Sequence, residues 1–525
     1  MNNNPTNPVV QSLISKKRSA GRHADAHTLW LFTNRGRTIL STAGLLVMLA
    51  ILLLHPRRPV LPWYCVLTWT LACIWIGRMC IRTSPMLIAP ILFVLCFFVG
   101  YPLKIVYGQL SPRLFSMLST GLYFARKSPR LDTEIMLAAL AGLAGVALAV
   151  KIALFIRAER LRKGLDRPAR RSASGKLPDR QLLTLLIWVL PVFIALLYAF
   201  MWRYHIGQTG VRAVVLPYRL SGIAVQIRSV FIPMAEVYLF WQVLKLRSRG
   251  LIWAMIIIIV LEATLCGFLS MSRAAVVARV IVFAVLSAKI YKELPAATLV
   301  KTIVGGTLML LLHVFIIVPS ITTFRVYSWG GHSVGSSVQA ALSESLRPSN
   351  YQHRLNFVFG RMLGVEDLMG VAAYQDKNFS LMYKALTTGH GLRFVNYNMF
   401  GLRQFSGRQI GGKTFQGRGM SVFGYLYLSG SSLIVMLGSL IVCLLVCLAE
   451  MYLDRTAVFA AAVWVTVCVP SIWEGVFRSL FYALIVFAVS AWFFIRVLDP
   501  WLHRTARRSL LFRRTRTRMA LSFRT

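Results

Sequence analysis

The feature that most constrains this chain is the recurrence of long apolar runs that hold few charges. A bilayer core of about 30 Å requires roughly 20 apolar residues of helix. A soluble core cannot bury so many segments of this kind, and the 525 residues are 57% hydrophobic and only 14% charged. The sequence therefore predicts an all-α fold, a polytopic transmembrane bundle of 10–12 helices. The candidate spans are 38–54, 60–77, 86–106, 133–156, 181–202, 222–244, 251–270, 274–290, 302–319, 421–449, 456–472 and 479–497.

The basic residues are concentrated in a few connections, and this distribution predicts an orientation. Lys and Arg number 59 against 17 Asp and Glu, which gives a formal net charge of +42. With the N-terminus in the cytoplasm, the basic N-tail 1–37, the loop 157–180 and the C-tail 498–525 all fall on the cytoplasmic side, as the positive-inside rule requires. We expect these segments to face anionic membrane lipids. Nucleic acid is not an expected partner, because no recognition motif accompanies the charge.

One long connection interrupts the pattern of short loops. Helices one to nine are expected in 38–319 and the last three in 421–497, so residues 320–420 form a large extracytoplasmic loop with eleven basic residues. Apolar residues at helical spacing predict an amphipathic helix over 353–373. Six glycines interleaved with Phe, Arg and Lys predict an ordered, turn-rich segment over 401–419.

Several arginines of this outer side suit a phosphate or pyrophosphate. Arg354 and Arg361 are seven residues apart and project from nearly the same helix face, where two guanidinium groups bind phosphate bidentately. The alternative is a helix face that lies on anionic headgroups. Ser272 is a good N-cap, which places Arg273 beside the free N–H groups of a helix start; the alternative is an arginine that anchors the helix end. Arg325 is expected where the ninth helix leaves the bilayer.

Ionisable residues in or beside the apolar runs are further candidates, because burying them in a membrane is costly. Arg228 is expected to support the site from within a span, where it would pair with a carboxylate on a neighbouring helix and face the outer cavity. Glu474 and Arg478 are four residues apart and suit a helical ion pair. In the loop, Glu366 is either a general base for a sugar hydroxyl or the partner of a salt bridge.

Motifs for several other chemistries are absent from the sequence. There is no phosphate-binding glycine loop with its lysine, no zinc-protease or serine-hydrolase motif, and no Asp-x-Asp. ATP hydrolysis and metal-dependent transfer from nucleotide sugars therefore have no support, and we expect neither a metal nor a cofactor. The spacing of Cys443 and Cys447 is interpreted as two packed apolar side chains.

Three segments and their setting carry a family resemblance. The segments are LSMSRAAVVARVIVF, HRLNFVFGRMLGVEDLMGV and GMSVFGYLYLSGS. Together with a large basic outer loop before the last three helices, they resemble the O-antigen polymerases (Wzy-type) and the related O-antigen ligases over roughly residues 180–495. The resemblance implies a glycosyltransferase of the bacterial inner membrane. It would transfer a growing glycan from undecaprenyl pyrophosphate to a lipid-linked repeat unit at the outer face, in O-antigen or exopolysaccharide synthesis.

The same resemblance implies roles for particular residues and partners. The catalytic base would be Glu366 or His390, and the substrate an undecaprenyl-pyrophosphate-linked oligosaccharide, with a chain-length regulator and a flippase as protein partners. A ligase, a lipid-linked-oligosaccharide flippase or transporter, and a non-catalytic scaffold stay open as alternatives. The implied pyrophosphate ligands are Arg273, Arg325, Arg354, Arg361 and Arg418.

Overall fold

The fold is built from helices that pack along their lengths. Every regular element among the described residues is a helix, so the prediction of an all-α chain is confirmed there. Eight of these helices are long and apolar enough to cross a membrane, and α22 is a shorter apolar helix. The computed structural model describes residues 60–81, 87–110, 123–163, 178–208, 216–270, 273–290, 316–329, 331–345, 364–387, 420–473 and 477–503, together with a few isolated positions.

Most of the predicted apolar runs coincide with one of these helices. The runs 38–54 and 302–319 lie largely outside the described residues. The eight long apolar helices are Trp63–Ile81, Ala89–Leu110, Pro129–Arg162, Arg180–Arg203, Pro217–Leu246, Arg249–Ser270, Ser432–Asp454 and Leu480–His503.

One half of the bundle surrounds the longest helix, α7 (Pro129–Arg162). Ser128 begins this helix, because its side chain accepts a hydrogen bond from the Leu131 amide and Pro129 supplies a preset φ. At about 1.5 Å per residue its 34 residues exceed a 30 Å bilayer core, and its surplus turns carry Arg157, Arg160 and Arg162. The other elements of this half are α3 (Trp63–Ile81), α4 (Ala89–Phe98), the π-helix η2 (Val99–Leu103), α5 (Lys104–Leu110) and α21 (Ser432–Thr456).

Glycines allow α7 and α21 to approach closely. A Cβ at Gly145 would lie 2.2 Å from the carbonyl oxygen of Met436 in α21. A Cβ at Gly142 would lie 2.6 Å from the ring of Phe423, in the short helix that precedes α21. Small residues permit such backbone contact between apolar helices. Any larger residue at Gly145 would therefore push these two helices apart.

The other half contains the helices from the middle of the sequence and the last two helices. Asp179 caps α8 by accepting from the amides of Gln181 and Leu182. The segment from Pro217 to Leu246 is kinked near its start, where Tyr218 and Arg219 have φ of +54° and +57°, and it changes its helix type again at η5. The elements are α8 (Arg180–Arg203), the 3₁₀-helix η4 (Pro217–Arg219), α9 (Leu220–Gln226), the π-helix η5 (Ile227–Phe231), α10 (Ile232–Leu246), α11 (Arg249–Ser270), α12 (Arg273–Ile290), α22 (Val458–Trp473), α23 (Phe477–Trp492) and the π-helix η9 (Phe493–Leu498).

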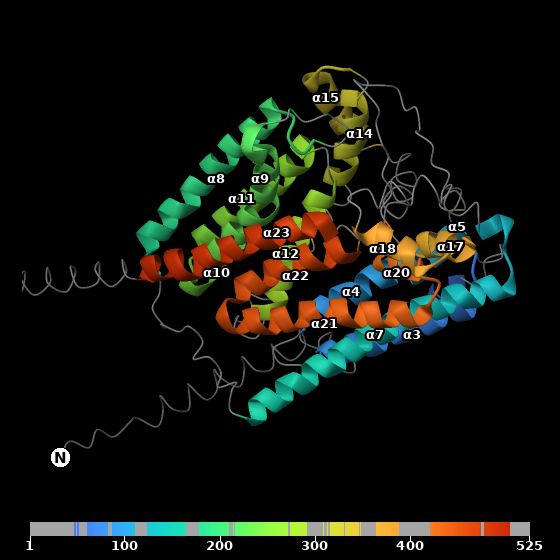
Figure 1. Ribbon diagram of the computed structural model, residues 1–525. Coiled ribbons are helices and arrows are strands. Elements are labelled where there is room, and N and C mark those ends of the chain that lie inside the picture. The colour runs from blue at the N-terminus through green and yellow to red at the C-terminus, as the bar shows by residue number, and fades with distance from the viewer. Residues whose placement is uncertain are drawn as a thin grey trace, which may run out of the picture.

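The elements of the long connection gather at one end of the bundle. In Figure 1, α8 and α11 run toward α14 and α15, while α7 and α21 run toward α17, α18 and α20. The opposite end of the long helices carries the basic ends of α7 and α10. The elements are α14 (Val318–Trp329), α15 (Val334–Ser345), α17 (Val365–Ala373), α18 (Phe379–Thr387) and α20 (Val422–Tyr427).

Two predicted elements differ in detail from the structure. The predicted amphipathic helix 353–373 is described only over α17, and all nine residues of α17 are buried, so this part has no solvated face. The predicted run 421–449 is broken into α20 and α21 by a turn at Gly430, whose φ of +77° suits glycine. The apolar pattern alone does not register this break, because both helices are apolar.

Candidate functional site

A buried cluster of charged residues joins four helices in the half of the bundle that contains α8. The Arg279 guanidinium of α12 binds the Glu262 carboxylate of α11 through two contacts, with Nε 2.8 Å from Oε2 and Nη2 2.9 Å from Oε1. Tyr198 of α8 donates its hydroxyl to the same carboxylate. A bidentate pair of this kind is among the strongest polar contacts in a protein. The cluster therefore fixes α8, α11 and α12 relative to one another.

A second carboxylate lies beside this pair. Glu236 of α10 is 0% exposed, and its Oε2 lies 3.9 Å from the Nε of Arg279. Within the described part of the chain, neither oxygen of Glu236 has a hydrogen-bond partner. A single guanidinium is thus shared unequally between two buried acids.

The same arginine supports an irregular turn. Its Nη2 donates to the backbone carbonyl of Arg228 at 2.5 Å, within the π-helix η5. π-helical turns leave backbone groups without their usual i→i+4 partner and occur frequently at functional sites. Arg279 donates to one carbonyl of this turn, and this contact holds in place the turn from which the Arg228 side chain projects.

The Arg228 guanidinium lies against the turn that follows α8. A Cβ at Gly207 would lie 3.0 Å from Nη1 and 3.3 Å from Nη2, so glycine makes room for this group, and its φ of +68° also suits glycine. The next residue, Gln208, is 8% exposed, and His205 Nδ1 lies 3.1 Å from its Oε1. The Nε2 of Gln208 has no hydrogen-bond partner among the residues that the structure describes.

These groups form a site of donors. The Arg228 side chain is half-buried, and across the described ranges no carboxylate lies within ion-pair distance of it. A guanidinium and a side-chain amide in one turn offer several N–H groups and a positive charge. That chemistry binds an anion with several oxygens, such as a phosphate. We call this arrangement of Arg228, Gly207 and Gln208 the α8-end site.

The predicted Arg325 lies at the same end of the bundle. It is 8% exposed in α14. Its neighbour Phe324 packs edge-on against Phe268 of α11. Trp202 of α8, just before the α8-end site, packs against the small cluster that Phe324 forms with Ala341 of the next helix. The helix continues past Pro319 to Trp329, so Arg325 lies within a helix rather than after one.

Glu366 occupies a different place in the structure. It is buried in α17, where Lys104 of α5 donates to its carboxylate. Asp367 caps the same helix, with Oδ2 3.1 Å from the amide of Gly364, and Arg126 binds the carbonyl of Ala373 at its other end at 3.0 Å. Of the two readings of Glu366 from the sequence, these contacts favour the salt-bridge partner.

The remaining predicted site residues are only partly accounted for. α12 begins at Arg273, as the N-cap signal of Ser272 predicts. The side chains of Arg273 and of Arg478 in α23 are not among those that the structure describes. The structure therefore does not place these predictions beside the α8-end site or apart from it. Outside the described residues altogether are His390, Arg354, Arg361, Arg418 and Glu474.

Three buried cations were not among the predicted site residues. Arg279, Lys289 and Lys104 all stand inside or at the edge of predicted apolar runs. A cation within such a run is itself a signal, because it requires a partner in an apolar environment. The acids Glu236 and Glu262 in neighbouring runs are the corresponding signal for Arg279.

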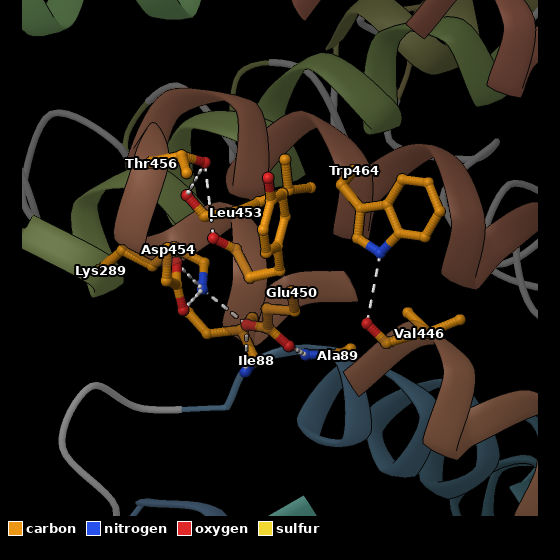
Figure 2. Close-up of polar contacts among 10 residues, drawn as sticks. Ile88, Ala89, Lys289, Val446, Glu450, Leu453, Asp454, Thr456 and Trp464 are labelled. Carbon is orange, nitrogen blue, oxygen red and sulfur yellow. Dashed lines mark hydrogen bonds and ion pairs between the residues drawn. The ribbon is translucent and has the colours of Figure 1, made fainter. Parts of the chain in front are cut away.

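A second buried cluster joins α12, α21 and the start of α4 at the other end of the bundle (Figure 2). Lys289 of α12 lies 2.6 Å from Glu450 and 2.9 Å from Asp454, both on α21. Glu450 also accepts from the amides of Ile88 and Ala89, at 2.8 and 2.9 Å. Because the first amides of a helix have no partner within it, this carboxylate caps α4 from another helix. All of its contacts are structural.

Comparisons with known proteins assign no family. No protein-family model, no curated protein and no solved structure matches the chain.

Proposed function

We propose that the chain is a polytopic membrane protein that polymerises lipid-linked glycans. The eight long apolar helices support the membrane placement. The basic end of the bundle, with Arg157, Arg160, Arg247 and Arg249, would face the cytoplasm under the positive-inside rule. The α8-end site then faces the outer side of the bacterial inner membrane, with both termini in the cytoplasm and 10–12 helices in all.

The observation that carries the proposal is the Arg228 guanidinium. It is half-buried and free of ion pairs with the described carboxylates, and its turn is held by the buried Arg279. A fixed cation at the end of an apolar bundle suits an anion that is attached to a lipid. The pyrophosphate of a polyprenyl-linked oligosaccharide has this chemistry, and its tail would lie in the bilayer.

In this reaction the bond between the sugar and the pyrophosphate oxygen breaks, while an acceptor sugar hydroxyl loses its proton and forms the new glycosidic bond. Arg228 would stabilise the negative charge that develops on the leaving pyrophosphate. Arg273 and Arg325 would extend this role at the same end. His390 would receive the proton of the acceptor, because Glu366 is engaged by Lys104.

Two alternatives use the same anionic lipid. A ligase would transfer the finished glycan to a lipid acceptor through the same donor site. A flippase or transporter is favoured by a separate observation, the cluster of Arg279, Glu236 and Glu262 inside apolar helices, because intramembrane charges mark transport pathways in many membrane proteins.

The test is a deletion strain complemented with variants and scored by glycan ladders. Arg228→Gln should reduce chain growth about 10²-fold, the usual effect of removing one group that stabilises a developing charge. Arg203→Gln is the matched control, because Arg203 is an exposed arginine at the same end of α8. Membrane levels of both variants should equal wild type.

The ladder also separates the alternatives. Single repeat units on the lipid indicate lost polymerisation, and long unattached chains indicate a lost ligase. Intact ladders together with blocked export of lipid-linked units would show a transporter. Wild-type ladders and wild-type export in Arg228→Gln would show that the α8-end site does not hold the substrate.

A further inference from the structure

Glu236 is an acid that the bundle encloses completely. It lies in α10, where every residue from Ile232 to Phe240 is buried, so this part of the helix is covered on all its faces. A charged side chain near a helix surface can extend along that surface to reach water. Glu236 has no such route, because it is 0% exposed. Any charge that it carries must therefore be compensated inside the bundle.

The ionisable groups around Glu236 come from the elements that pack against α10, which are α8, α11, α12, α22 and η5. Arg279 is the cation that lies within ion-pair distance of Glu236 among the residues that the structure describes. The Arg228 guanidinium is directed to Gly207 instead. The other ionisable side chains are Tyr198 of α8, Glu262 and Cys266 of α11, Cys468 of α22, and on α10 itself Tyr238, which donates to Asp499, and Lys245 near the end of the helix.

The guanidinium of Arg279 is already directed to other acceptors. Its Nε and Nη2 lie 2.8 and 2.9 Å from the two oxygens of Glu262, and Nη2 also donates to the carbonyl of Arg228. Glu262 receives a further hydrogen bond from Tyr198. The distance from Nε to Oε2 of Glu236 is 3.9 Å, which is too long for a hydrogen bond.

The charges of the cluster balance only if one of the two acids is neutral. Two ionised carboxylates beside one guanidinium would leave a net negative charge in an apolar interior, where an uncompensated charge is very costly. One proton removes this cost. Hydrogen bonds to a carboxylate favour its ionised form, and Glu262 receives three while the described residues give Glu236 none. The proton therefore belongs on Glu236.

We infer that Glu236 is a proton-binding site inside the bundle, and that the structure shows its proton-bound state beside an ionised pair of Glu262 and Arg279. The bound proton leaves the guanidinium to Glu262 and to the carbonyl of Arg228. Release of the proton would place a second negative charge 3.9 Å from Nε of Arg279 and would draw the guanidinium away from both. The position of the η5 turn thus depends on this proton.

The proton is measured directly by infrared spectroscopy of the full-length protein in detergent at neutral pH, where an exposed glutamate is ionised. Wild type should show the carbonyl stretching band of a protonated carboxyl group, and this band should shift in D₂O. Glu236→Gln should lose one such band. Glu134→Gln is the control, because the Glu134 carboxylate is partly exposed and lies 3.5 Å from Nζ of Lys377, so its substitution should leave this region of the spectrum unchanged.

Thermal unfolding separates the two acids of the cluster. Glu236→Gln should keep the wild-type midpoint within about 2 °C, because an amide is a neutral replacement of similar shape for a protonated carboxyl group. Glu262→Gln removes the ionised partner of Arg279, and its midpoint should fall by about 5 °C. The protonated-carboxyl band should be lost in Glu262→Gln as well, since Glu236 is then the one acid left to pair with Arg279 and gives up its proton.

Three results would overturn the inference. The first is a folded Glu236→Gln with the same protonated-carboxyl bands as wild type. The second is a lowered midpoint in Glu236→Gln together with a wild-type midpoint in Glu262→Gln, which would place the proton on Glu262. The third is a loss of folding in both Glu236→Gln and Glu236→Met, which would show that the protein needs a negative charge at this position. None of these measurements involves a glycan, so they succeed or fail independently of the proposed function.

Discussion

Arg279 donates through Nη2 to the backbone carbonyl of Arg228 at 2.5 Å. The buried Arg279 guanidinium thus holds the turn from which the half-buried Arg228 side chain projects. The two arginines lie 51 residues apart, on α12 and η5. Because Arg279 is also bound to Glu262, the geometry of the α8-end site depends on an ion pair inside the bundle. Under the proposed function, stability and chain growth are therefore coupled at this point, and substitutions can separate them.

The first prediction concerns the buried cation. Arg279→Met leaves Glu262 and Glu236 without their guanidinium, and breaking a buried pair in this way costs about 3–5 kcal/mol. We expect a large fall in the thermal unfolding midpoint in detergent, measured by fluorescence-detected size exclusion. Chain growth should be lost as well, because the Arg228 carbonyl loses its donor.

Removing the whole cluster separates these two effects. The triple variant Arg279→Met, Glu262→Met and Glu236→Gln contains no uncompensated charge and should regain most of the midpoint. Chain growth should stay low, because the turn at Arg228 is still unsupported. Full recovery of both properties would show that Arg279 does not position Arg228.

The sequence alone predicts the helices better than their contacts. α7 and α8 follow from apolar runs with clear caps at Ser128 and Asp179, because those signals are local. The division between α20 and α21 does not follow, since the glycine turn lies within an apolar run. Helix existence is encoded by periodicity, whereas a break depends on one residue's backbone conformation.

The candidate site shows the same limit. Arg228 is recognisable from the sequence as an intramembrane arginine, and a carboxylate on a neighbouring helix is its natural expected partner. In the structure both neighbouring carboxylates, Glu236 and Glu262, lie beside Arg279 instead, and the Arg228 guanidinium is left available to a ligand. Which side chains pair between two helices depends on how each helix is rotated about its axis and how far it is shifted along the bundle. The residue spacing within a single helix determines neither.

The second prediction concerns the close approach of α17 and η2. A Cβ at Gly364 would lie 1.9 Å from the carbonyl oxygen of Gly100, a contact that no side-chain movement relieves. Gly364→Ala should therefore lower the free energy of unfolding by about 1–3 kcal/mol, as overpacking does. It should also make α17 accessible to limited proteolysis. Gly335→Ala in α15 is the control, because nothing lies within 4 Å of its Cβ position. Equal proteolysis of the two variants would show that α17 is not held by this contact.

The third prediction concerns the role of Glu366. Lys104→Met leaves the buried Glu366 carboxylate without its cation and should lower the free energy of unfolding by about 3–5 kcal/mol. The thermal unfolding midpoint should fall strongly as a result. The double variant Lys104→Met, Glu366→Leu should restore the midpoint. Because Glu366 is buried and bound to Lys104, we also expect this double variant to support chain growth, measured by glycan ladders. A folded double variant without chain growth would instead support Glu366 as the catalytic base.

The fourth prediction concerns pH. Lys377 donates to the carbonyl of Ala372 at 2.6 Å, lies 3.5 Å from the carboxylate of Glu134, and stands 5.1 Å from the centre of the Tyr427 ring. Burial lowers its pKa below the ordinary 10.5, although Glu134 acts in the opposite direction. Burial raises the pKa of Tyr427 to about 12, above this window.

The sign of the effect follows from proton counts. The pKa of Lys377 is lower in the folded protein than in the unfolded chain, so the folded protein releases this proton at a lower pH. As the pH rises toward 10.5, the unfolded chain therefore holds more protons than the folded protein, and the free energy of unfolding increases. The unfolding midpoint of wild type should therefore rise across this range relative to that of Lys377→Met. Lys384→Met, on the exposed side of α18, should keep the wild-type dependence. A constant difference between wild type and Lys377→Met at every pH would mean that Lys377 keeps its ordinary pKa in the folded protein.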